Sequence, residues 1–203
     1  MDLNILSVPS FWVPELKQKL FKIEKGNSKL VVLFPGKNFS CDKPCLHYAA
    51  TMAFQSGYDV LVLEYGYQAA RTDLDIKDLT KIIDESEACI SQIVHEYEQL
   101  IFISKSLGTI VAGEVEKRLN LSLKQHIYLT PLQDTIPYIN SSNSIVVYGT
   151  NDPLFNKELA EKIKDKTIIE YQNANHSLET NDVEESINII QSLIRVYKEV
   201  FKS

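Results

Sequence analysis

The sequence predicts an α/β fold in which a mostly parallel, doubly wound sheet is flanked by helices. Three observations predict it: short apolar runs recur along the chain, segments of helical length separate them, and the two kinds of segment alternate. The apolar runs are continuous rather than alternating, which is typical of strands buried on both faces of a parallel sheet. No repeat, linker or low-complexity tract interrupts the pattern, so we expect residues 1–203 to form a single domain.

Six short runs rich in Val, Ile and Leu are the expected strands. They cover residues 30–34, 60–63, 100–103, 127–129, 145–148 and 168–169. The chain before residue 16 looks irregular, and residues 16–23 fit either a half-buried strand or a short helical turn. We therefore expect few additional strands at the start of the sheet.

Four segments between or after these runs are the expected helices. They cover residues 44–55, 76–97, 107–119 and 182–201. Acidic residues precede the first two, and Asn181 followed three residues later by Glu184 is a capping pattern for the last.

Composition and charge exclude several classes of protein. The net charge of −6 does not suit a nucleic-acid binder, which needs a basic surface to neutralise phosphates. No apolar run approaches the ~18 residues of a membrane span, and the first residues lack the basic start of a secretory signal. Three cysteines, an odd number, fit reduced thiols, so we expect a cytoplasmic protein. From the charge and the short apolar runs we expect no nucleic-acid and no membrane partner. A metal or redox pair at Cys41 and Cys45 is the alternative interpretation of their spacing.

A serine-containing motif follows the strand expected at 100–103. It reads Ser104-Lys105-Ser106-Leu107-Gly108 and leads directly into an expected helix. A nucleophilic serine on a tight strand-to-helix turn needs small residues two positions before and after it, hence the pattern Gly-x-Ser-x-Gly. Ser104 replaces the first glycine with another small side chain. The motif predicts Ser106 as a nucleophile at a helix N-terminus, where the helix dipole favours negative charge.

Two further strand ends carry an acid and a histidine. Asp152 follows the strand at 145–148, and His176 follows the run at 168–169. The order Ser106, Asp152, His176 is the one that serine hydrolases of this α/β type use. His176 would take the serine proton, and Asp152 would hold the imidazole in the required tautomer.

An oxyanion hole needs two hydrogen-bond donors near the nucleophile. We expect one to be the backbone N–H of Leu107, directly after Ser106. We expect the other to be the backbone N–H of Lys37, in the loop that follows the strand at 30–34. Tyr65 and Tyr67 follow the strand at 60–63 and are candidates for substrate contact; packing against neighbouring loops is the alternative.

At this point the chain resembles the α/β-hydrolase superfamily over residues 28–203, and is most similar to its small bacterial esterase and thioesterase-like members. The segments that carry the resemblance are Phe34-Pro35-Gly36, Glu64-Tyr65-Gly66-Tyr67, Ser104-Lys105-Ser106-Leu107-Gly108, Gly149-Thr150-Asn151-Asp152 and Asn175-His176-Ser177. Pro35-Gly36 stands where many members have His-Gly. The short stretch between the strands at 127–129 and 145–148 leaves room for a minimal lid or none.

Other assignments compete with this triad. Ser104 is the rival nucleophile, Asp134 the rival acid, and Lys105 a rival catalytic amine; we expect Lys105 to anchor a loop instead. Of the other histidines, His47 and His95 fall in expected helices, and we expect His126 to be structural.

The sequence therefore predicts a serine hydrolase that acts on a small ester or thioester. A peptidase, amidase or acyltransferase with the same triad, and a catalytically silent binding or interaction protein of the same fold, are the alternatives. We expect no cofactor and no metal, a small-molecule acyl substrate, and a monomer or homodimer.

Overall fold

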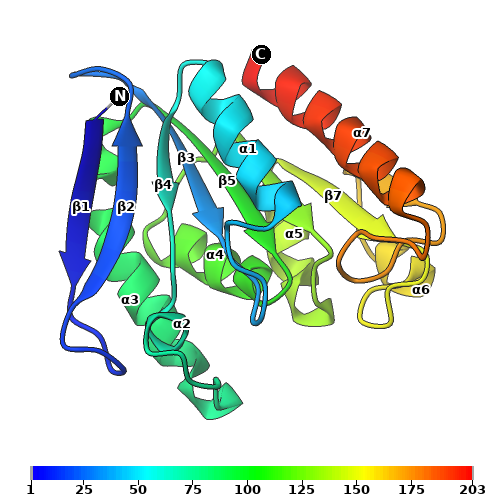
Figure 1. Cartoon of the computed structure of the whole chain (residues 1–203), viewed down its shortest axis with the longest axis horizontal. Helices are drawn as coiled ribbons and strands as arrows, with labels where there is room; N and C mark the ends of the chain where they lie inside the picture. The colour runs from blue at the N-terminus through cyan, green and yellow to red at the C-terminus, as the bar shows by residue number, and fades with distance from the viewer. Residues whose placement is uncertain (1, 203) are drawn as a thin grey trace.

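The computed structural model describes residues 2–202, which form one eight-stranded sheet between two layers of helices (Figure 1). The strands are β1 (Asp2–Val8), β2 (Leu16–Lys22), β3 (Lys29–Phe34), β4 (Asp59–Val62), β5 (Gln99–Lys105), β6 (Gln125–Leu129), β7 (Ser144–Gly149) and β8 (Thr167–Tyr171). Their order across the sheet is β1-β2-β4-β3-β5-β6-β7-β8. All six strands expected from the apolar runs are present.

The sheet is parallel except at its start. Strands β4, β3, β5, β6, β7 and β8 pair in parallel, whereas β2 pairs antiparallel with both β1 and β4. The carboxyl ends of the parallel strands therefore meet at one edge, where ligands bind in sheets of this kind. This architecture confirms the predicted fold class.

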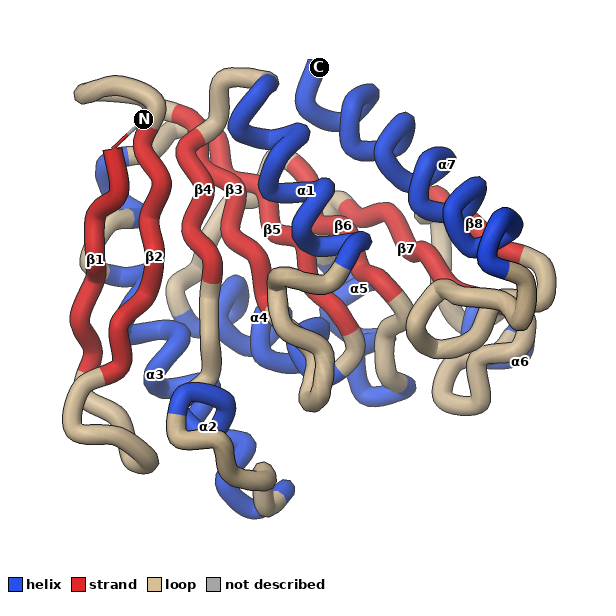
Figure 2. The backbone as a smooth tube through the Cα atoms, in the orientation of Figure 1, coloured by secondary structure: helices blue, strands red, loops and turns tan. Residues whose placement is uncertain are grey.

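The described residues form seven α-helices. They are α1 (Pro44–Gln55), α2 (Gly66–Ala69), α3 (Leu79–Ser91), α4 (Leu107–Arg118), α5 (Ile136–Ser141), α6 (Lys157–Ala160) and α7 (Val183–Lys202). Helices α1 and α7 lie on one face and α3, α4, α5 and α6 on the other (Figures 1 and 2). Successive strand residues alternate between the two layers: Val31 packs beneath α1 and Val32 packs beneath α4.

Three expectations about the elements are wrong. The start of the chain is not irregular but forms the edge strand β1. Most of its residues are exposed, including Leu3 at 53% and Ile5 at 48%, so burial imposes no clear apolar pattern on this strand. The expected helix 76–97 ends at Ser91, after which the chain passes through a 3-10 turn, Val94–Glu96, to enter β5. The cap of α7 is Asp182 rather than Asn181, because the Asp182 carboxylate accepts from the Glu185 N–H at 2.9 Å.

No helix within residues 2–202 has both the length and the apolarity needed to cross a membrane.

Candidate active site

Ser106 lies at a sharp turn between β5 and α4. Its φ of 53° and ψ of −120° are unusual for a residue with a side chain, and its N–H donates to the Leu129 carbonyl at 3.0 Å. Such backbone strain persists where surrounding contacts enforce it, and it is common at catalytic residues. The turn leaves Ser106 partly exposed at the N-terminus of α4.

Gly108 and Ser104, the two small residues that flank Ser106, are small for different structural reasons. A Cβ on Gly108 would lie 2.4 Å from the Pro35 carbonyl oxygen, so only glycine lets α4 approach the end of β3 this closely. Ser104 is fully buried, and its hydroxyl pairs with His126 Nε2 at 3.0 Å. His126 Nδ1 in turn contacts the Glu116 carboxylate at 3.0 Å, and burial lowers the pKa of the histidine. Ser104 and His126 therefore form a buried network beneath the turn, away from solvent.

The structure brings Ser106, His176 and Asp152 together from three separate loops. His176 Nε2 lies 2.7 Å from Ser106 Oγ, and His176 Nδ1 lies 2.9 and 2.8 Å from the two carboxylate oxygens of Asp152. Asp152 is 3% exposed, and one of its oxygens also accepts from the Leu154 N–H at 2.8 Å. The arrangement can move a proton from the serine hydroxyl to an imidazole that the carboxylate orients.

Close packing of two loops sets the contact between the acid and the histidine. A Cβ on Gly149 would lie 2.1 Å from the Ala174 carbonyl oxygen. The Asn151 N–H donates to that same carbonyl at 2.9 Å. The loops that carry Asp152 and His176 are therefore joined through their backbones, independently of the two side chains.

Lys105 supports the histidine loop from beneath. Its ammonium donates to the His176 carbonyl at 2.5 Å and to the Thr130 hydroxyl, and it lies 4.9 Å from the centre of the Phe39 ring. The side chain is 1% exposed, and this burial lowers the pKa of Lys105 to about 8. Lys105 thus connects the ends of β5 and β6 with the histidine loop, which is an anchoring role, and it does not contact Ser106 Oγ.

The two expected oxyanion-hole donors belong to the Ser106 turn and to the loop packed against it. Within residues 2–202, neither the Leu107 N–H nor the Lys37 N–H has a hydrogen-bond acceptor. A Cβ built on Gly36 would lie 3.3 Å from Ser106 Cβ, so glycine allows the loop before Lys37 to reach the nucleophile. Both amides are therefore available to a bound group.

Gln68 holds this loop, and the sequence did not indicate it. Its amide nitrogen donates to the Gly36 carbonyl at 3.0 Å, and its amide oxygen accepts from the Tyr65 N–H at 3.1 Å. The N–H of Lys37 belongs to the same trans peptide as the Gly36 carbonyl and points the opposite way. Gln68 therefore orients the Lys37 N–H. A glutamine three residues into a short helix is too common a pattern to single out.

The expected substrate contacts at Tyr65 and Tyr67 are not what the structure shows. Both side chains are buried, at 1% and 2% exposure. The Tyr67 hydroxyl donates to the Lys37 carbonyl at 2.7 Å, so it fixes the loop rather than facing a ligand. The Tyr65 hydroxyl is buried and has no hydrogen-bond partner in the described residues. Packing against neighbouring loops, the alternative interpretation, is the observed one.

The rival assignments lie elsewhere. Asp134 is exposed in a 3-10 turn, and the carboxylate that contacts His176 is that of Asp152. His47 lies in α1, and His95 is exposed in a 3-10 turn rather than in an α-helix. Cys41 and Cys45 are free and buried, and burial raises the pKa of both thiols, that of Cys45 to about 12.

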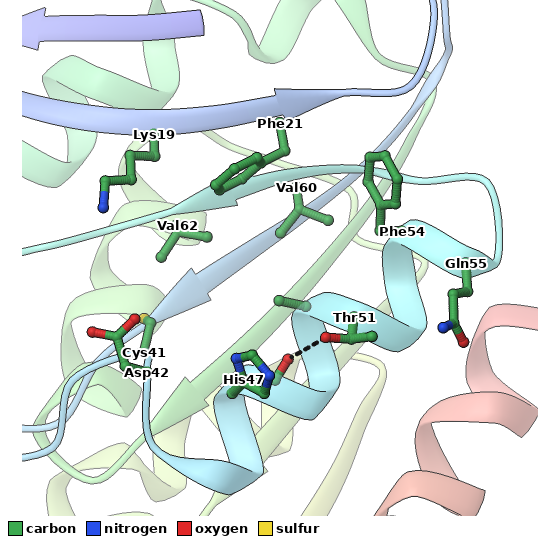
Figure 3. Close-up of a pocket in the computed structure, with 11 residues that line it drawn as sticks. Lys19, Phe21, Cys41, Asp42, His47, Thr51, Phe54, Gln55, Val60 and Val62 are labelled. Carbon is green, nitrogen blue, oxygen red and sulfur yellow. Dashed lines mark hydrogen bonds between the residues drawn. The ribbon is translucent and has the colours of Figure 1, made fainter. Parts of the chain in front are cut away.

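No cluster of three or more His, Cys, Asp or Glu side chains in residues 2–202 is placed to bind a metal ion. A hollow of about 410 Å³ lies between α1 and strands β2 and β4 (Figure 3). Lys19, Phe21 and His47 point into it, and no member of the triad lines it. None of its lining residues comes from the loops that carry Ser106, Asp152 or His176, so this hollow is separate from the candidate active site.

Comparison with known proteins rests on structure alone, because no protein-family model and no curated protein matches the sequence. An α/β serine hydrolase homologue from Coxiella burnetii is 13% identical over 97% of this chain and 98% of its own, with a TM-score of 0.71. A dienelactone hydrolase from Anabaena variabilis is 16% identical over 99% of this chain and 97% of its own, with a TM-score of 0.74.

A lidless α/β serine hydrolase from Xanthomonas campestris is 12% identical over 98% of this chain and 95% of its own, with a TM-score of 0.70. The chain has the α/β-hydrolase fold. As in that neighbour, the fold carries no lid: residues 130–143, between β6 and β7, form only a 3-10 turn and the short helix α5. The α/β-hydrolase fold thus presents Ser106 directly at the surface of the carboxyl edge of the sheet.

Proposed function

We propose that the protein is a serine hydrolase that cleaves a small ester or thioester through an acyl-enzyme on Ser106. The observation that carries the proposal is the unbroken contact from Ser106 Oγ through His176 to Asp152, at 2.7 and 2.8 Å. The structural neighbours described as serine hydrolases and as a dienelactone hydrolase support a hydrolytic reaction.

In the first half of the reaction, Ser106 Oγ attacks the carbonyl carbon of the substrate while His176 Nε2 takes the hydroxyl proton. The carbonyl oxygen becomes an oxyanion that the N–H groups of Leu107 and Lys37 stabilise. His176 then gives its proton to the departing alcohol or thiol, and the bond to the leaving group breaks. The acyl group remains on Ser106.

In the second half, water replaces the alcohol or thiol. His176 takes a proton from the water, whose oxygen attacks the acyl carbon, and the second tetrahedral intermediate uses the same two N–H donors. Collapse of this intermediate returns the proton to Ser106 Oγ and releases the carboxylic acid. Asp152 stabilises the imidazolium in both halves.

Labelling with a fluorophosphonate probe and hydrolysis of p-nitrophenyl acetate test this proposal. The wild-type chain should be labelled on Ser106, and Ser106→Ala should lose both labelling and turnover. Ser104→Ala should still be labelled, because Ser104 is buried and its hydroxyl pairs with His126. Absence of both labelling and turnover in the folded wild-type protein would contradict the proposal and favour a silent binding protein.

A further inference from the structure

A second hollow, of about 660 Å³, lies between the N-terminal parts of α1 and α7. The two helices run side by side on one face of the sheet (Figure 1). This volume is within the range of ~300–1,000 Å³ that is usual for small-molecule sites. We call it the α1–α7 groove. Its lining residues are Phe39, Pro44, Cys45, Tyr48, Ser177, Glu179, Thr180, Val183, Ser186, Ile187, Ile190, Gln191 and Ile194.

The groove exists because α7 has more apolar surface than the core uses. Its core-facing stripe includes Leu193 and Tyr197, which are fully buried. A second stripe, Val183, Ile187, Ile190 and Ile194, repeats at spacings of four, three and four residues and therefore lies along one side of the helix.

Much of this second stripe is open to solvent. Val183 is 73% exposed and Ile187 is 60% exposed, and Tyr48 of α1, across the groove, is 42% exposed. Exposed apolar residues that gather in one concave place, rather than singly, mark a binding surface. From Val183 to Ile194 the stripe extends about 16 Å along α7, which is long enough for an extended hydrocarbon chain.

One end of the groove lies beside the nucleophile. Two of its lining residues belong to the loops of the candidate active site: Ser177 directly follows His176, and Phe39 closes the loop that contains Lys37. A Cβ built on Gly36 would lie 3.1 Å from Phe39 Cβ and 3.3 Å from Ser106 Cβ, so these two side chains flank the same glycine. No member of the triad lines the groove, so a group bonded to Ser106 would enter it by passing Phe39.

The chemistry of the lining selects the class of ligand. Among the described lining residues Glu179 is the one with a formal charge, and the others are apolar or neutral polar groups. A single acid and no base do not suit an anionic or strongly polar group. The apolar side chains of the lining suit a hydrocarbon chain, and Glu179 is exposed to solvent.

We propose that the α1–α7 groove binds the acyl chain of the substrate, so that the preferred substrates are esters or thioesters of medium-length, unbranched fatty acids. This inference rests on the proposed function of Ser106. It names the acyl group that Ser106 receives: the carbonyl carbon lies at Ser106 Oγ, and the chain runs past Phe39 toward Ile187 and Ile194.

The test compares kcat/KM for p-nitrophenyl acetate and p-nitrophenyl octanoate in three proteins. In the wild-type chain, kcat/KM for the octanoate ester should exceed kcat/KM for the acetate ester by about tenfold or more, since each buried methylene contributes up to about fourfold. Ile187→Glu should lower kcat/KM for octanoate about tenfold and leave acetate within about twofold, because burying the chain beside a charge is unfavourable. Ile5→Glu is the matched control: Ile5 is 48% exposed on β1, at the far edge of the sheet, and should change neither value.

Binding of octanoate to the Ser106→Ala variant tests the groove without turnover. Amide resonances of Tyr48, Val183 and Ile187 should shift on titration, and the additional change Ile187→Glu should abolish these shifts. If the wild-type protein is not labelled by the phosphonate but octanoate still binds in the groove, the proposed function is overturned and the groove remains a fatty-acid site.

Three results would overturn the groove proposal itself. Equal kcat/KM for the two esters would show that the chain is not bound, and an equal loss for both in Ile187→Glu would indicate a general disturbance of the site. Dissociation of a wild-type dimer by Ile187→Glu, with an unchanged preference between the esters, would show that a second copy of the chain covers the groove.

Discussion

At the scale of single residues, the candidate site depends on groups that hold backbone atoms in place. Ser106 itself has a positive φ, a conformation that costs about 1–3 kcal/mol and persists because its neighbours enforce it. Gln68 and Tyr67 fix the peptide that carries the Lys37 N–H, and Lys105 fixes the carbonyl of His176. The geometry of the three side chains in the candidate triad thus depends on several residues outside the triad.

Gln68→Glu should reduce catalysis without removing the triad. The carboxylate has nearly the shape of the amide but only accepts hydrogen bonds, so it repels the Gly36 carbonyl and turns the Lys37 N–H away from Ser106. We expect kcat for p-nitrophenyl acetate to fall by up to about 100-fold, as for loss of one oxyanion-hole donor. An unchanged kcat would show that the Lys37 N–H does not bind the oxyanion. Phosphonate labelling at long times should persist, which separates this effect from unfolding.

Lys105 should make stability depend on pH in the alkaline range. The folded chain loses the Lys105 proton near pH 8 and the unfolded chain near 10.5, so the unfolded state binds more protons between these values and raising the pH stabilises the folded state. Relative to Lys105→Met, the wild-type free energy of unfolding should increase by about 2 kcal/mol from pH 7 to 9.5. Urea titrations of both proteins at the two pH values measure this difference. A difference that does not change with pH would contradict it.

At the scale of elements, the site depends on how closely helices and loops approach strand ends. Gly108 lets the first turn of α4 contact the end of β3, and Gly149 lets β7 contact the histidine loop. Neither approach tolerates a side chain, because the nearest atoms are backbone carbonyl oxygens rather than flexible side-chain ends.

Gly108→Ala should therefore lower kcat by more than the accompanying loss of stability would explain. Its Cβ would push the Pro35 carbonyl, and with it the loop of Lys37, away from Ser106; we expect overpacking to cost about 1–3 kcal/mol. Gly113→Ala, on the same helix, is the matched control: its Cβ would lie 2.4 Å from Tyr138 Cγ, so it should also destabilise the fold, but the atoms that must shift belong to Tyr138 of α5 and not to the Lys37 loop. Thermal unfolding and kcat measured side by side should show loss of both for Gly108→Ala and retained kcat for Gly113→Ala. Equal kcat in the two variants would contradict this account.

The elements that were predicted wrongly from the sequence are those whose conformation depends on contacts with other segments of the chain. Strand β1 is an edge strand with one open face, so its apolar residues do not form a continuous run. The helix expected at 76–97 stops at Ser91 because the chain must reach the start of β5, where the N–H groups of Glu98 and Gln99 both donate to the Ser28 carbonyl. Helical propensity alone carries no information about such a partner.

At the scale of the whole molecule, strand order decides which loops meet. Placing β5 between β3 and β6 puts the Ser106 turn next to the Lys37 loop, and the later strands β7 and β8 bring the acid and the histidine to the same edge. The central strands are buried on both faces, whereas β1 is open on one face and β8 is partly exposed.

Amide hydrogen exchange should follow this arrangement. The amides of β3, β5 and β6 should exchange most slowly, since they open only with the whole fold, and those of β1 and β8 should exchange much faster. Exchange measured by NMR or mass spectrometry over hours would show the gradient. Equal protection of β1 and β5 would contradict it and indicate that something covers the open edge of the sheet in solution.

The sequence by itself determined the α/β class, six of the strands and the choice of Ser106, Asp152 and His176 as the candidate triad, because continuous apolar runs and the residues at their ends are local features. Only the tertiary structure decided that Tyr65 and Tyr67 are buried, that Gln68 and Lys105 hold the loops, and that α7 leaves a groove next to the loop of His176. These features arise from contacts between segments far apart in the chain. Burial and hydrogen-bond partners at such positions depend on what the fold places opposite them, which no local pattern of residues specifies.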